Sequence, residues 1–419
     1  IARKDKHDSI DTYGNNAPDG IVGPHREKEG SYFTIKEIWS PVQVSKPIFN
    51  AAFSGKLEIE NNYHYTNLSV CKFRWQLTRY ALVKENKTGH SIISSGNAAT
   101  ELSPGKKGSL QLTLPSDWRK ADAMQFTAID RNGHELYTWT WPIKTASVIT
   151  ASLLSGSLKS DILLEEQSKE NIYTIIGDNI HYNFDTEKGL LHSVIKHNTI
   201  IPFSDGPVLA EGTQTLQSFK HYKEDNKIIV EASFSGKNSL NIKWIISSSQ
   251  PVQLDYSYTQ KDSSDYHGIS FDMDESVITG MKWLGDGPYH VWKNRLKGTS
   301  MDVWHKKYNN TITGETFDYP EFKGYHANMY WAVIETKQGS FTVYTDEPGL
   351  YLQMLHPEKQ KTKFNPFVNP PFPKANLSFL HAIPAIGTKF KAAETMGPQS
   401  KRNGPVPDMI KGKLWFDFR

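Results

Sequence analysis

The chain has 419 residues, of which 48 are basic and 45 are acidic, so its formal net charge is only +3. This balance argues against an electrostatic surface for nucleic acid, and no apolar run reaches the roughly 20 residues that span a membrane. The one cysteine, Cys71, leaves no partner within the sequence for a disulfide or a thiolate metal site. Aromatic residues make up 12% of the chain, which suits both packed β-sandwiches and proteins that stack sugars on rings.

Residues 1–46 are predicted to form a loop followed by one short helix. Ser31 is a candidate N-cap for the stretch "SYFTIKEIW", in which Phe33, Ile35 and Ile38 form an apolar side. We expect this helix to end before Pro41, because proline cannot continue a helix.

Between residues 47 and 145, apolar residues recur at every second position, which is the period of a β-strand. The alternation is clear in "KLEIEN", "FRWQL", "SLQLTLP" and "YTWTW", and the turn-forming runs "NKTG", "SPGKKG" and "DRNG" separate these segments. Short strands at this spacing over roughly 100 residues indicate an immunoglobulin-like antiparallel β-sandwich. Residues 146–168 mix serine with aliphatic residues and lack turn pairs, so we interpret them as a linker or an edge strand.

From residue 169 to residue 419 the strand period returns, with almost no helical periodicity. The segments "KIIVEASFSG", "NIKWIIS", "VQLDYSYTQ", "SFTVYTD" and "KLWFDF" all alternate. In the third of these, Val252, Leu254 and Tyr256 share one face while Asp255 and Ser257 lie on the other, as in a half-solvated strand. About 250 residues of such strands predict a large two-sheet assembly or a barrel, and a mainly all-β fold for the chain.

Two stretches are candidate sugar-binding surfaces. Residues 281–304 offer Trp283 and Trp292 for stacking and Arg295 as a hydrogen-bond donor, around an irregular turn in "GDGP". The alternative is that these rings pack into a corner of a sandwich. Residues 364–373 crowd proline and phenylalanine into a rigid loop, which either carries ligand contacts or packs on its own sheet.

Catalytic signatures are scarce in the sequence. Glycoside hydrolysis needs two carboxyl groups, one to donate a proton and one to attack or to activate water. The acids between residues 19 and 37 fall in one loop and one helix, so they are poorly arranged to oppose each other across a sugar. The acidic run "DMDES" lacks the glycine and the distal glutamate of a calcium loop, and no phosphate-binding loop occurs.

The order of these pieces resembles glycoside hydrolase family 2, the β-galactosidase group. "DGIVGPHREKEGSYFTIKEIW" resembles the loop and helix that close the catalytic barrel of that family, and "GKLEIENNYHYTNLSVCKFRWQL" resembles its second sandwich. "WLGDGPYHVWKNRLKG" resembles a signature of the β-galactosidase small-chain domain. The resemblance implies the tail of a TIM barrel at 1–46, an immunoglobulin-like sandwich at 47–145, a linker at 146–168 and a mutarotase-like β-supersandwich at 169–419.

The resemblance also suggests roles for residues near the N-terminus. It implies that residues 19–37 form a wall beside a catalytic centre, and that the reacting carboxylates lie upstream of this sequence, with no catalytic residue in the chain itself. The acid/base of the family belongs to an Asn-Glu pair, and this dipeptide is absent. Asp19 is implied as a sugar contact and cation ligand, while His25 and Glu29 are candidates to face a substrate. A sodium or magnesium ion in the intact enzyme is left open.

These observations lead us to expect the C-terminal part of an exo-glycosidase that cleaves a terminal β-linked sugar, with β-galactosides as the leading substrates. The expected partner is a carbohydrate, without nucleic acid or membrane. A homo-oligomer is left open, and a periplasmic or secreted bacterial location is favoured. The rival interpretation is a stand-alone, non-catalytic carbohydrate-binding protein. A third, a mutarotase or polysaccharide lyase, requires a base such as His381 or Tyr325 beside an acid in a cleft.

Overall fold

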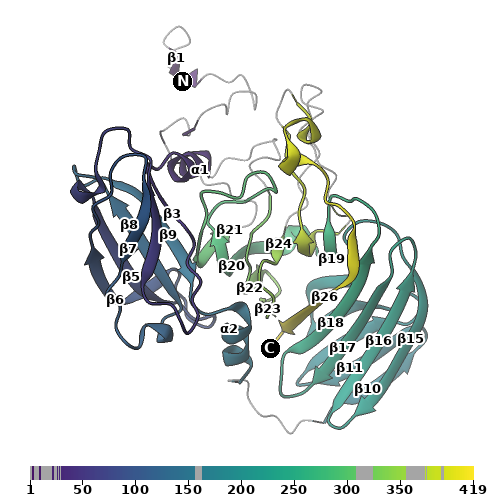
Figure 1. Ribbon diagram of the computed structural model, residues 1–419. Helices are drawn as coiled ribbons and strands as arrows, with labels where there is room; N and C mark the ends of the chain where they lie inside the picture. Colours follow the sequence, from purple (N-terminus) through teal and green to yellow (C-terminus); the bar gives the residue numbers. More distant parts are fainter. Residues whose placement is uncertain are drawn as a thin grey trace.

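The computed structural model describes residues 2–3, 9–10, 21–22, 26, 28, 30–155, 163–307, 324–354, 373, 375–387 and 391–419. Within these ranges most regular structure is β-strand, which confirms the prediction of a mainly all-β fold. Figure 1 shows a smaller sandwich on one side and a pair of large sheets on the other, with a short helix between them. No helix in the described part is long and apolar enough to cross a membrane.

The N-terminal segment contributes a pair of short strands and one helix. Strands β1 (Ala2–Arg3) and β2 (Ser9–Ile10) pair with each other, and helix α1 spans Gly30–Ile38. Ser31, the predicted cap, therefore lies inside the helix, which begins one residue earlier. Because most of residues 1–29 fall outside the described ranges, the barrel tail expected there stays a prediction.

The smaller sandwich consists of two antiparallel sheets, with strand orders β3-β4-β7 and β6-β5-β8-β9. Its interior holds the alternating residues found in the sequence, among them Phe73 and Phe126, whose rings stack with centroids 5.8 Å apart. The immunoglobulin-like sandwich is thus confirmed. The strands are β3 (Val42–Val44), β4 (Lys56–Asn61), β5 (Lys72–Tyr80), β6 (His90–Ala98), β7 (Lys107–Gln111), β8 (Ala123–Ile129) and β9 (Glu135–Pro142), with 3-10 turns η3 (Leu68–Val70) and η4 (Trp118–Lys120).

Helix α2 (Ala146–Ser155) follows the sandwich, in the segment that we had interpreted as a linker or an edge strand. The hydroxyl of Thr145 accepts a bond from the N–H of Val148 at 3.4 Å, at the start of the helix. The hydroxyl of Thr150 donates to the carbonyl of Thr345 at 2.6 Å, which fastens the helix to the large sheets. Such a short helix leaves a weak periodic signal in a segment of serine and small aliphatic residues.

The remaining strands form two large antiparallel sheets that face each other. The eight-stranded sheet has the order β10-β11-β12-β13-β14-β19-β25-β24, and the nine-stranded sheet has the order β15-β16-β17-β18-β26-β23-β22-β20-β21, counted over the described residues. Between them lies an aromatic core in which Phe271 and Phe416 pack against Phe203, and Trp244 packs against Phe416. This arrangement agrees with the predicted supersandwich.

The strands of the eight-stranded sheet are β10 (Glu165–Lys169), β11 (Ile172–Gly177), β12 (Ile180–Asp185), β13 (Leu190–Lys196), β14 (Thr199–Leu209), β19 (His267–Asp272), β24 (Tyr351–Gln353) and β25 (Leu377–Ala382). Those of the nine-stranded sheet are β15 (Thr215–Glu224), β16 (Lys227–Ser235), β17 (Leu240–Ser247), β18 (Val252–Gln260), β20 (Ile278–Gly287), β21 (Ser300–Lys307), β22 (Trp331–Thr336), β23 (Phe341–Thr345) and β26 (Val406–Asp417). The short 3-10 turns are η5 (Glu275–Val277), η7 (Ala393–Thr395) and η8 (Pro398–Ser400).

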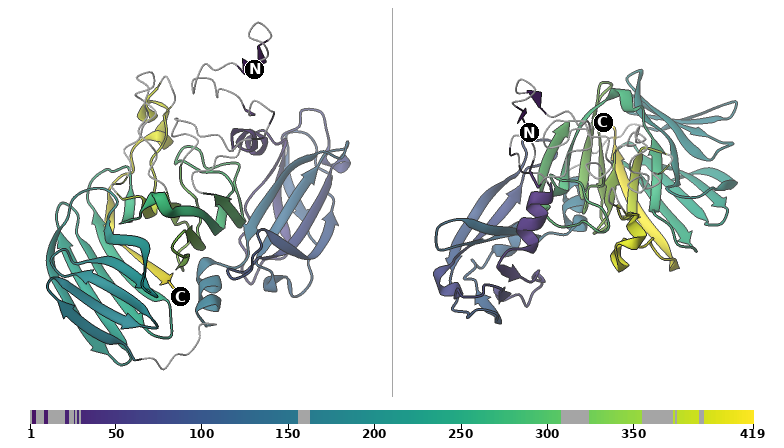
Figure 2. Two further views of the ribbon diagram at one scale, coloured as in Figure 1. Left: turned by 180° about the vertical axis from the view of Figure 1, so that it is seen from behind. Right: turned by 90° about the horizontal axis from the view of Figure 1, so that it is seen from above.

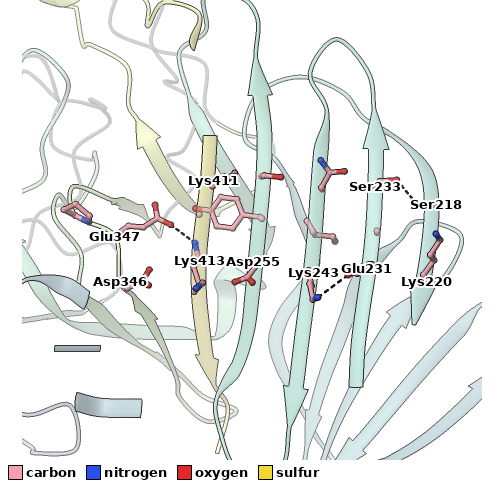
Figure 3. Close-up of a pocket in the computed structure, with 17 residues that line it drawn as sticks. Ser218, Lys220, Glu231, Ser233, Lys243, Asp255, Asp346, Glu347, Lys411 and Lys413 are labelled. Atoms are coloured by element: carbon pink, nitrogen blue, oxygen red, sulfur yellow. Dashed lines mark hydrogen bonds and ion pairs between the residues drawn. The ribbon is translucent and has the colours of Figure 1, made fainter. Parts of the chain in front are cut away.

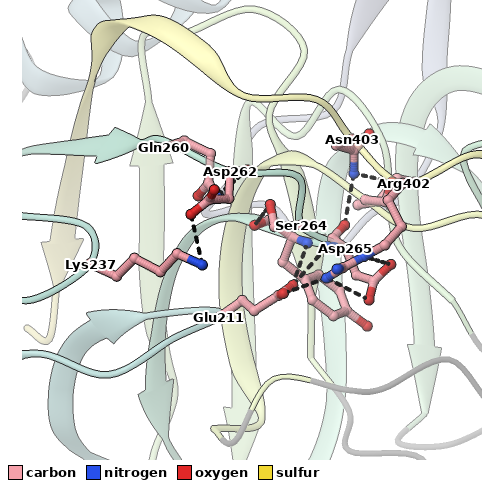
Figure 4. Close-up of polar contacts among 10 residues, drawn as sticks. Glu211, Lys237, Gln260, Asp262, Ser264, Asp265, Arg402 and Asn403 are labelled. Atoms are coloured by element: carbon pink, nitrogen blue, oxygen red, sulfur yellow. Dashed lines mark hydrogen bonds and ion pairs between the residues drawn. The ribbon is translucent and has the colours of Figure 1, made fainter.

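The segment that leads into β26 is held by polar contacts at one end of the large sheets (Figure 4). The guanidinium of Arg402 contacts Glu211 at 2.6 Å and Asp265 at 3.2 Å. Ser264 and Asn403 exchange backbone hydrogen bonds of 2.9 Å in both directions. These contacts join the loops after β14 and β18 to the start of β26, and they help to fix where β26 enters the nine-stranded sheet.

The small sandwich packs on the outer face of the nine-stranded sheet, over its β20–β23 half. Figure 2 shows this from behind and from above, with β15 on the far side of the sheet from the sandwich. A third apolar cluster fills the interface, and it includes Tyr80 of the sandwich with Leu284, Trp331 and Trp415 of the sheet. Polar contacts surround it: Lys282 Nζ donates to the carbonyls of residues 83 and 85 at 2.7 and 2.6 Å.

Glu37 connects helix α1 to both β-domains. One of its carboxylate oxygens accepts bonds from the Tyr137 hydroxyl at 3.0 Å and from the Gly298 N–H at 2.8 Å. The other oxygen lies 2.7 Å from Lys297 Nζ. The Glu37 side chain is 12% exposed, so these bonds to a charged, mostly buried group hold three parts of the chain together.

We predict that Glu37→Gln lowers the free energy of unfolding by about 1–3 kcal/mol, because hydrogen bonds to a charged group are worth about 1.5–3 kcal/mol. The matched control is Glu135→Gln, since Glu135 also joins α1 to β9, through Lys36 at 2.6 Å, but is 48% exposed. An exposed ion pair contributes at most about 1 kcal/mol, so the control should change little. Chemical denaturation measures both, and equal losses would contradict the role given to Glu37.

A second prediction concerns pH. His90 of the sandwich lies 2.7 Å from Asp302 of β21, and this hydrogen bond raises the pKa of His90, with partial burial opposing it. A raised histidine pKa means that the folded state binds the proton more tightly. Its contribution to stability should therefore be complete below about pH 6.5 and be lost as the pH rises through the folded-state pKa. Asp302→Asn should flatten this part of the stability–pH curve, and an unchanged slope would refute the assignment.

Candidate functional site

The structure leaves the predicted N-terminal site residues outside its described ranges. Asp19, His25 and Glu29 lie outside the described residues, so their roles toward substrate, and that of Asp19 toward a cation, stay predictions. The proline-rich stretch 364–373 also falls outside them, apart from residue 373. Among the residues that are described, no group of three or more His, Cys, Asp or Glu side chains could hold a metal ion.

The two predicted stacking tryptophans are core residues. Trp283 and Trp292 are each 0% exposed. The indole N–H of Trp283 donates to the carbonyl of Asp286 at 3.3 Å, and Trp292 packs edge-on against Tyr325 with centroids 5.2 Å apart. Neither ring presents a face to a sugar in this structure, so the packing alternative describes them and the sugar-platform interpretation is not supported. Arg295 lies in the same turn, paired to Trp292 through the backbone, and its predicted donor role stays a prediction.

A groove of about 730 Å³ lies on the outer face of the nine-stranded sheet, on the half that the sandwich leaves open. Figure 3 shows its floor crossing β15, β16, β17, β18 and β26, with Asp346 and Glu347 at one end, next to β26. Because side chains alternate along each strand, the floor is made by the outward residues of these strands. Those residues form two rows that run across the strands.

The first row alternates in charge from strand to strand. Its members are direct cross-strand partners in the order Lys220, Glu231, Lys243, Asp255 and Lys413. Lys243 Nζ lies 3.4 Å from the carboxylate of Glu231. Opposite charges placed directly across from each other stabilise strand pairing, so the register itself supports the row.

The second row is made mostly of short polar side chains. It runs in the order Ser218, Ser233, Asn241, Ser257 and Lys411, again as direct partners in the register. The hydroxyls of Ser218 and Ser233 are 2.7 Å apart. Because serine and asparagine are shorter than lysine and glutamate, this row lies lower than the charged row beside it and deepens the groove.

Between the two rows, Gly412 of β26 lies opposite Tyr256 of β18 and points inward. A Cβ atom at position 412 would lie 2.0 Å from Cζ of the Tyr256 ring, so glycine is required for this close approach. The ring crosses β26 on the inner side of the sheet. This contact lets β18 and β26 pair beneath the groove without a side chain between them.

Glu347 at the end of the groove is held by bonds on both oxygens. One accepts from the backbone N–H of Lys413, and the other lies 2.9 Å from His381 Nε2. His381 Nδ1 in turn lies 2.9 Å from the Tyr258 hydroxyl. Burial raises the pKa of Tyr258 well above its usual value, and Glu347 adds to the effect. Tyr258 therefore stays protonated and can donate its hydroxyl proton to Nδ1, and the tautomer of His381 with its proton on Nε2 donates to Glu347.

Asp346 stands beside Glu347 in a crowded, partly desolvated position. Burial raises its pKa, Lys413 opposes the shift, and the carboxylates of Glu347 and Asp255 add to it. Asp255 is itself held by the side-chain amide of Gln253 at 2.9 Å. This end of the groove is therefore rich in hydrogen-bond acceptors, with Lys413 as the neighbouring donor.

The mutarotase or lyase interpretation required a base beside an acid in a cleft, with His381 or Tyr325 as the base. The two residues differ in whether an acid lies next to them. His381 has Glu347 at 2.9 Å, at the edge of the groove. The Tyr325 hydroxyl instead lies 2.6 Å from that of Tyr266, and both rings are buried away from the groove. His381 is held between two partners, an arrangement that orients Glu347.

Sequence reasoning did not find the groove, although it identified the strands that form it. The segment "VQLDYSYTQ" showed Asp255 and Ser257 on a solvated face. The rows arise only when five strands adopt one register, and β26 joins the others from about 150 residues further along the chain than β18. The sequence does hold one signal for the groove: several strands carry charged and small polar residues at their solvent-facing positions.

Comparison with known proteins gives one family match. Residues 176–381, just under half of the chain, match the family described as beta galactosidase small chain. The matched part runs from β11 to β25 and includes most of the groove strands. It supports a relationship to β-galactosidases and a carbohydrate-related role for this part. No curated protein matches the chain.

Two solved structures share a low overall similarity with it. One is the galactose 1-epimerase from Lactobacillus acidophilus NCFM, with 10% identity, 62% of this chain and 98% of that chain covered, and a TM-score of 0.36. The other is a candidate mutarotase from Salmonella typhimurium, with 9% identity, coverage of 65% and 99%, and a TM-score of 0.32. At these scores the likeness supports no conclusion about function.

We predict that Glu347→Ala lowers the free energy of unfolding by about 1–3 kcal/mol, because it leaves His381 and the Lys413 N–H without their acceptor in a half-buried site. Glu335→Ala is the matched control: Glu335 also lies 2.9 Å from a histidine Nε2, that of His305, but this pair is 32% and 42% exposed. Glu335→Ala should therefore lower the free energy of unfolding by less than Glu347→Ala does. Nitrogen NMR should show neutral His381 protonated at Nε2, and protonation at Nδ1 would contradict the bonding scheme.

Proposed function

We propose that this chain is the C-terminal part of a carbohydrate-degrading exo-glycosidase of the β-galactosidase type. In this proposal it supplies accessory β-domains and walls of the substrate pocket, without the catalytic carboxylate pair. The observation that carries the proposal is the match of residues 176–381 to the beta galactosidase small chain. The order of sandwich and large paired sheets, which follows the resemblance seen in the sequence, adds support.

The acids of the groove are better suited to binding than to bond cleavage. A retaining glycosidase needs two carboxyl groups about 5 Å apart on opposite sides of the sugar, one of them a free nucleophile. Glu347 is bonded through both oxygens, and Asp255 accepts a bond from Gln253. Asp346 shares one end of the groove with both. These groups can accept bonds from sugar hydroxyls.

The contacts of Glu37 support the role as a pocket wall. Helix α1 follows residues 19–29, which contain the candidate contacts Asp19, His25 and Glu29. Glu37 ties α1 to Tyr137 in the small sandwich and to the loop at Gly298 in the large one. In the proposed enzyme these bonds would orient the segment that faces the substrate, so that the β-domains act as its foundation.

The second candidate function is a stand-alone carbohydrate-binding protein, and the open polar groove favours it. The two proposals differ in what the chain does alone. A binding protein is complete without further domains, whereas the glycosidase fragment depends on catalytic carboxylates supplied elsewhere in the enzyme.

We predict that the purified chain releases no aryl alcohol from aryl β-galactosides above the uncatalysed rate, because in this proposal the two catalytic carboxylates lie elsewhere in the enzyme. The variants Asp346→Asn and Asp255→Asn should leave this background unchanged. An active β-galactosidase in the same assay shows that the substrates and detection work. Turnover by the wild-type chain that disappears in either variant would overturn the proposal and place catalysis in the groove.

A further inference from the structure

We infer that the groove across β15, β16, β17, β18 and β26 is a non-catalytic binding site for a neutral oligosaccharide, which lies across the strands along the two polar rows. The choice of ligand class rests on the proposed carbohydrate function. The site itself rests on the register, charges and contacts of the groove residues. The groove lies near β15, at one end of the nine-stranded sheet. Helix α1 contacts the loop before β21, at the opposite end of the same sheet, so the groove and α1 occupy different parts of the molecule.

The charge of the groove favours a neutral ligand. Four lysines line it, at 220, 243, 411 and 413, and four acids, at 231, 255, 346 and 347. A polyanion would gain from the lysines but would be repelled by as many carboxylates. A sugar hydroxyl both donates and accepts, so it can bond to a lysine and to an adjacent carboxylate at once. A row that alternates donor and acceptor from strand to strand therefore suits a chain of hydroxyl groups.

Several groups in the rows have bonding capacity to spare. Among the described residues, the ammonium groups of Lys220, Lys411 and Lys413 have no carboxylate within ion-pair distance. The side chain of Ser257 also makes no hydrogen bond within this part of the structure. These groups are solvated in the free protein, and a hydroxyl-rich ligand can replace that water without leaving them unbonded.

The spacing of the strands sets the length of the ligand. Neighbouring strands are about 4.8 Å apart, so five strands span about 19 Å from the first to the last. A pyranose unit in an extended chain has about the length of one strand spacing. Each unit of such a chain would meet one side chain from each row, and about four units would cover the floor. Asp346 and Glu347 would then lie beside the unit at the β26 end.

Among the described residues the groove lining offers little aromatic surface, and this decides how the ligand is held. Tyr256, the aromatic residue among the described lining residues, has its ring on the inner side of β26, against Gly412. Tyr222 of β15 is exposed beside the groove, and its hydroxyl donates to Glu231 at 3.1 Å. Binding therefore depends mainly on hydrogen bonds, which replace bonds to water and give a modest net gain each. Affinity should accordingly increase with the number of sugar units, and single sugars should bind weakly.

The test is calorimetric titration of the full chain with neutral β-1,4-linked di- and tetrasaccharides of galactose, glucose, mannose and xylose, and with a sulfated galactose tetrasaccharide. We expect saturable binding of at least one neutral tetrasaccharide, at least about tenfold tighter than its disaccharide, because twice as many hydrogen bonds form. Asp255→Ala, which removes a central acceptor, and Asn241→Trp, which fills the floor, should each weaken binding at least about tenfold.

The control is Asp408→Ala, an exposed acid on β26 outside the groove, which should bind as the wild type does. Thermal unfolding checks that all variants fold. The two groove variants test the site in different ways, because one removes a hydrogen-bond acceptor and the other blocks the floor with a larger side chain. No saturable binding of any neutral tetrasaccharide, binding of the sulfated one alone, or unchanged affinity in both groove variants would overturn the inference. Hydrolysis of aryl glycosides is measured in a separate experiment. A result that contradicts the glycosidase proposal can therefore be distinguished from one that contradicts oligosaccharide binding in the groove.

Discussion

The arrangement of this chain depends on one sheet whose outer face has two different surroundings. Across β20–β23 that face is apolar, and Leu284 and Trp331 pack against the small sandwich. Across β15–β18 it carries charged and small polar residues and stays open. The change occurs within β26, where Trp415 lies in the interface while Lys413, the next outward residue, lies in the groove. Docking of the sandwich and the boundary of the groove are therefore set by the same strand.

The position of β26 is fixed by contacts at several points along it. Arg402 and Asn403 anchor the segment before it, Gly412 admits the ring of Tyr256, and the backbone N–H of Lys413 bonds to Glu347. A shift of this strand by one residue would exchange its inner and outer side chains. It would place Lys413 in the aromatic core and Leu414 in water. The register that creates the groove is therefore protected by the core beneath it.

Much of the fold could be predicted from the sequence, because alternation in single strands reports which residues are buried. "YTWTW" and "KLWFDF" became β9 and part of β26, and the division into a smaller and a larger β-region is seen in the structure. The tryptophans show where this reasoning ends. In the sequence Trp283 and Trp292 flank the glycine- and proline-containing run "GDGP". That pattern fits a ligand platform or a packed corner, and only the surrounding sheets decide between them. Helix α2 was not predicted, since its ten residues carry little periodic signal.

The burial of the aromatic residues limits the kinds of contact that this protein can offer to the carbohydrate that we propose as its ligand. The high proportion of aromatic residues suited both packed sandwiches and sugar stacking, and Trp244, Trp283, Trp292 and Trp331 are all fully buried and serve the cores and the interface. The open polar face then offers mainly hydrogen bonds, whose strength depends on how well the groups are held before binding. Here the strands provide that order: β16, β17, β18 and β26 are paired on both sides and the edge strand β15 on one, which fixes where each outward side chain lies. A sheet can therefore bind a long polar ligand through polar side chains that repeat from strand to strand. A loop lacks this repetition and would depend on stacking against aromatic rings.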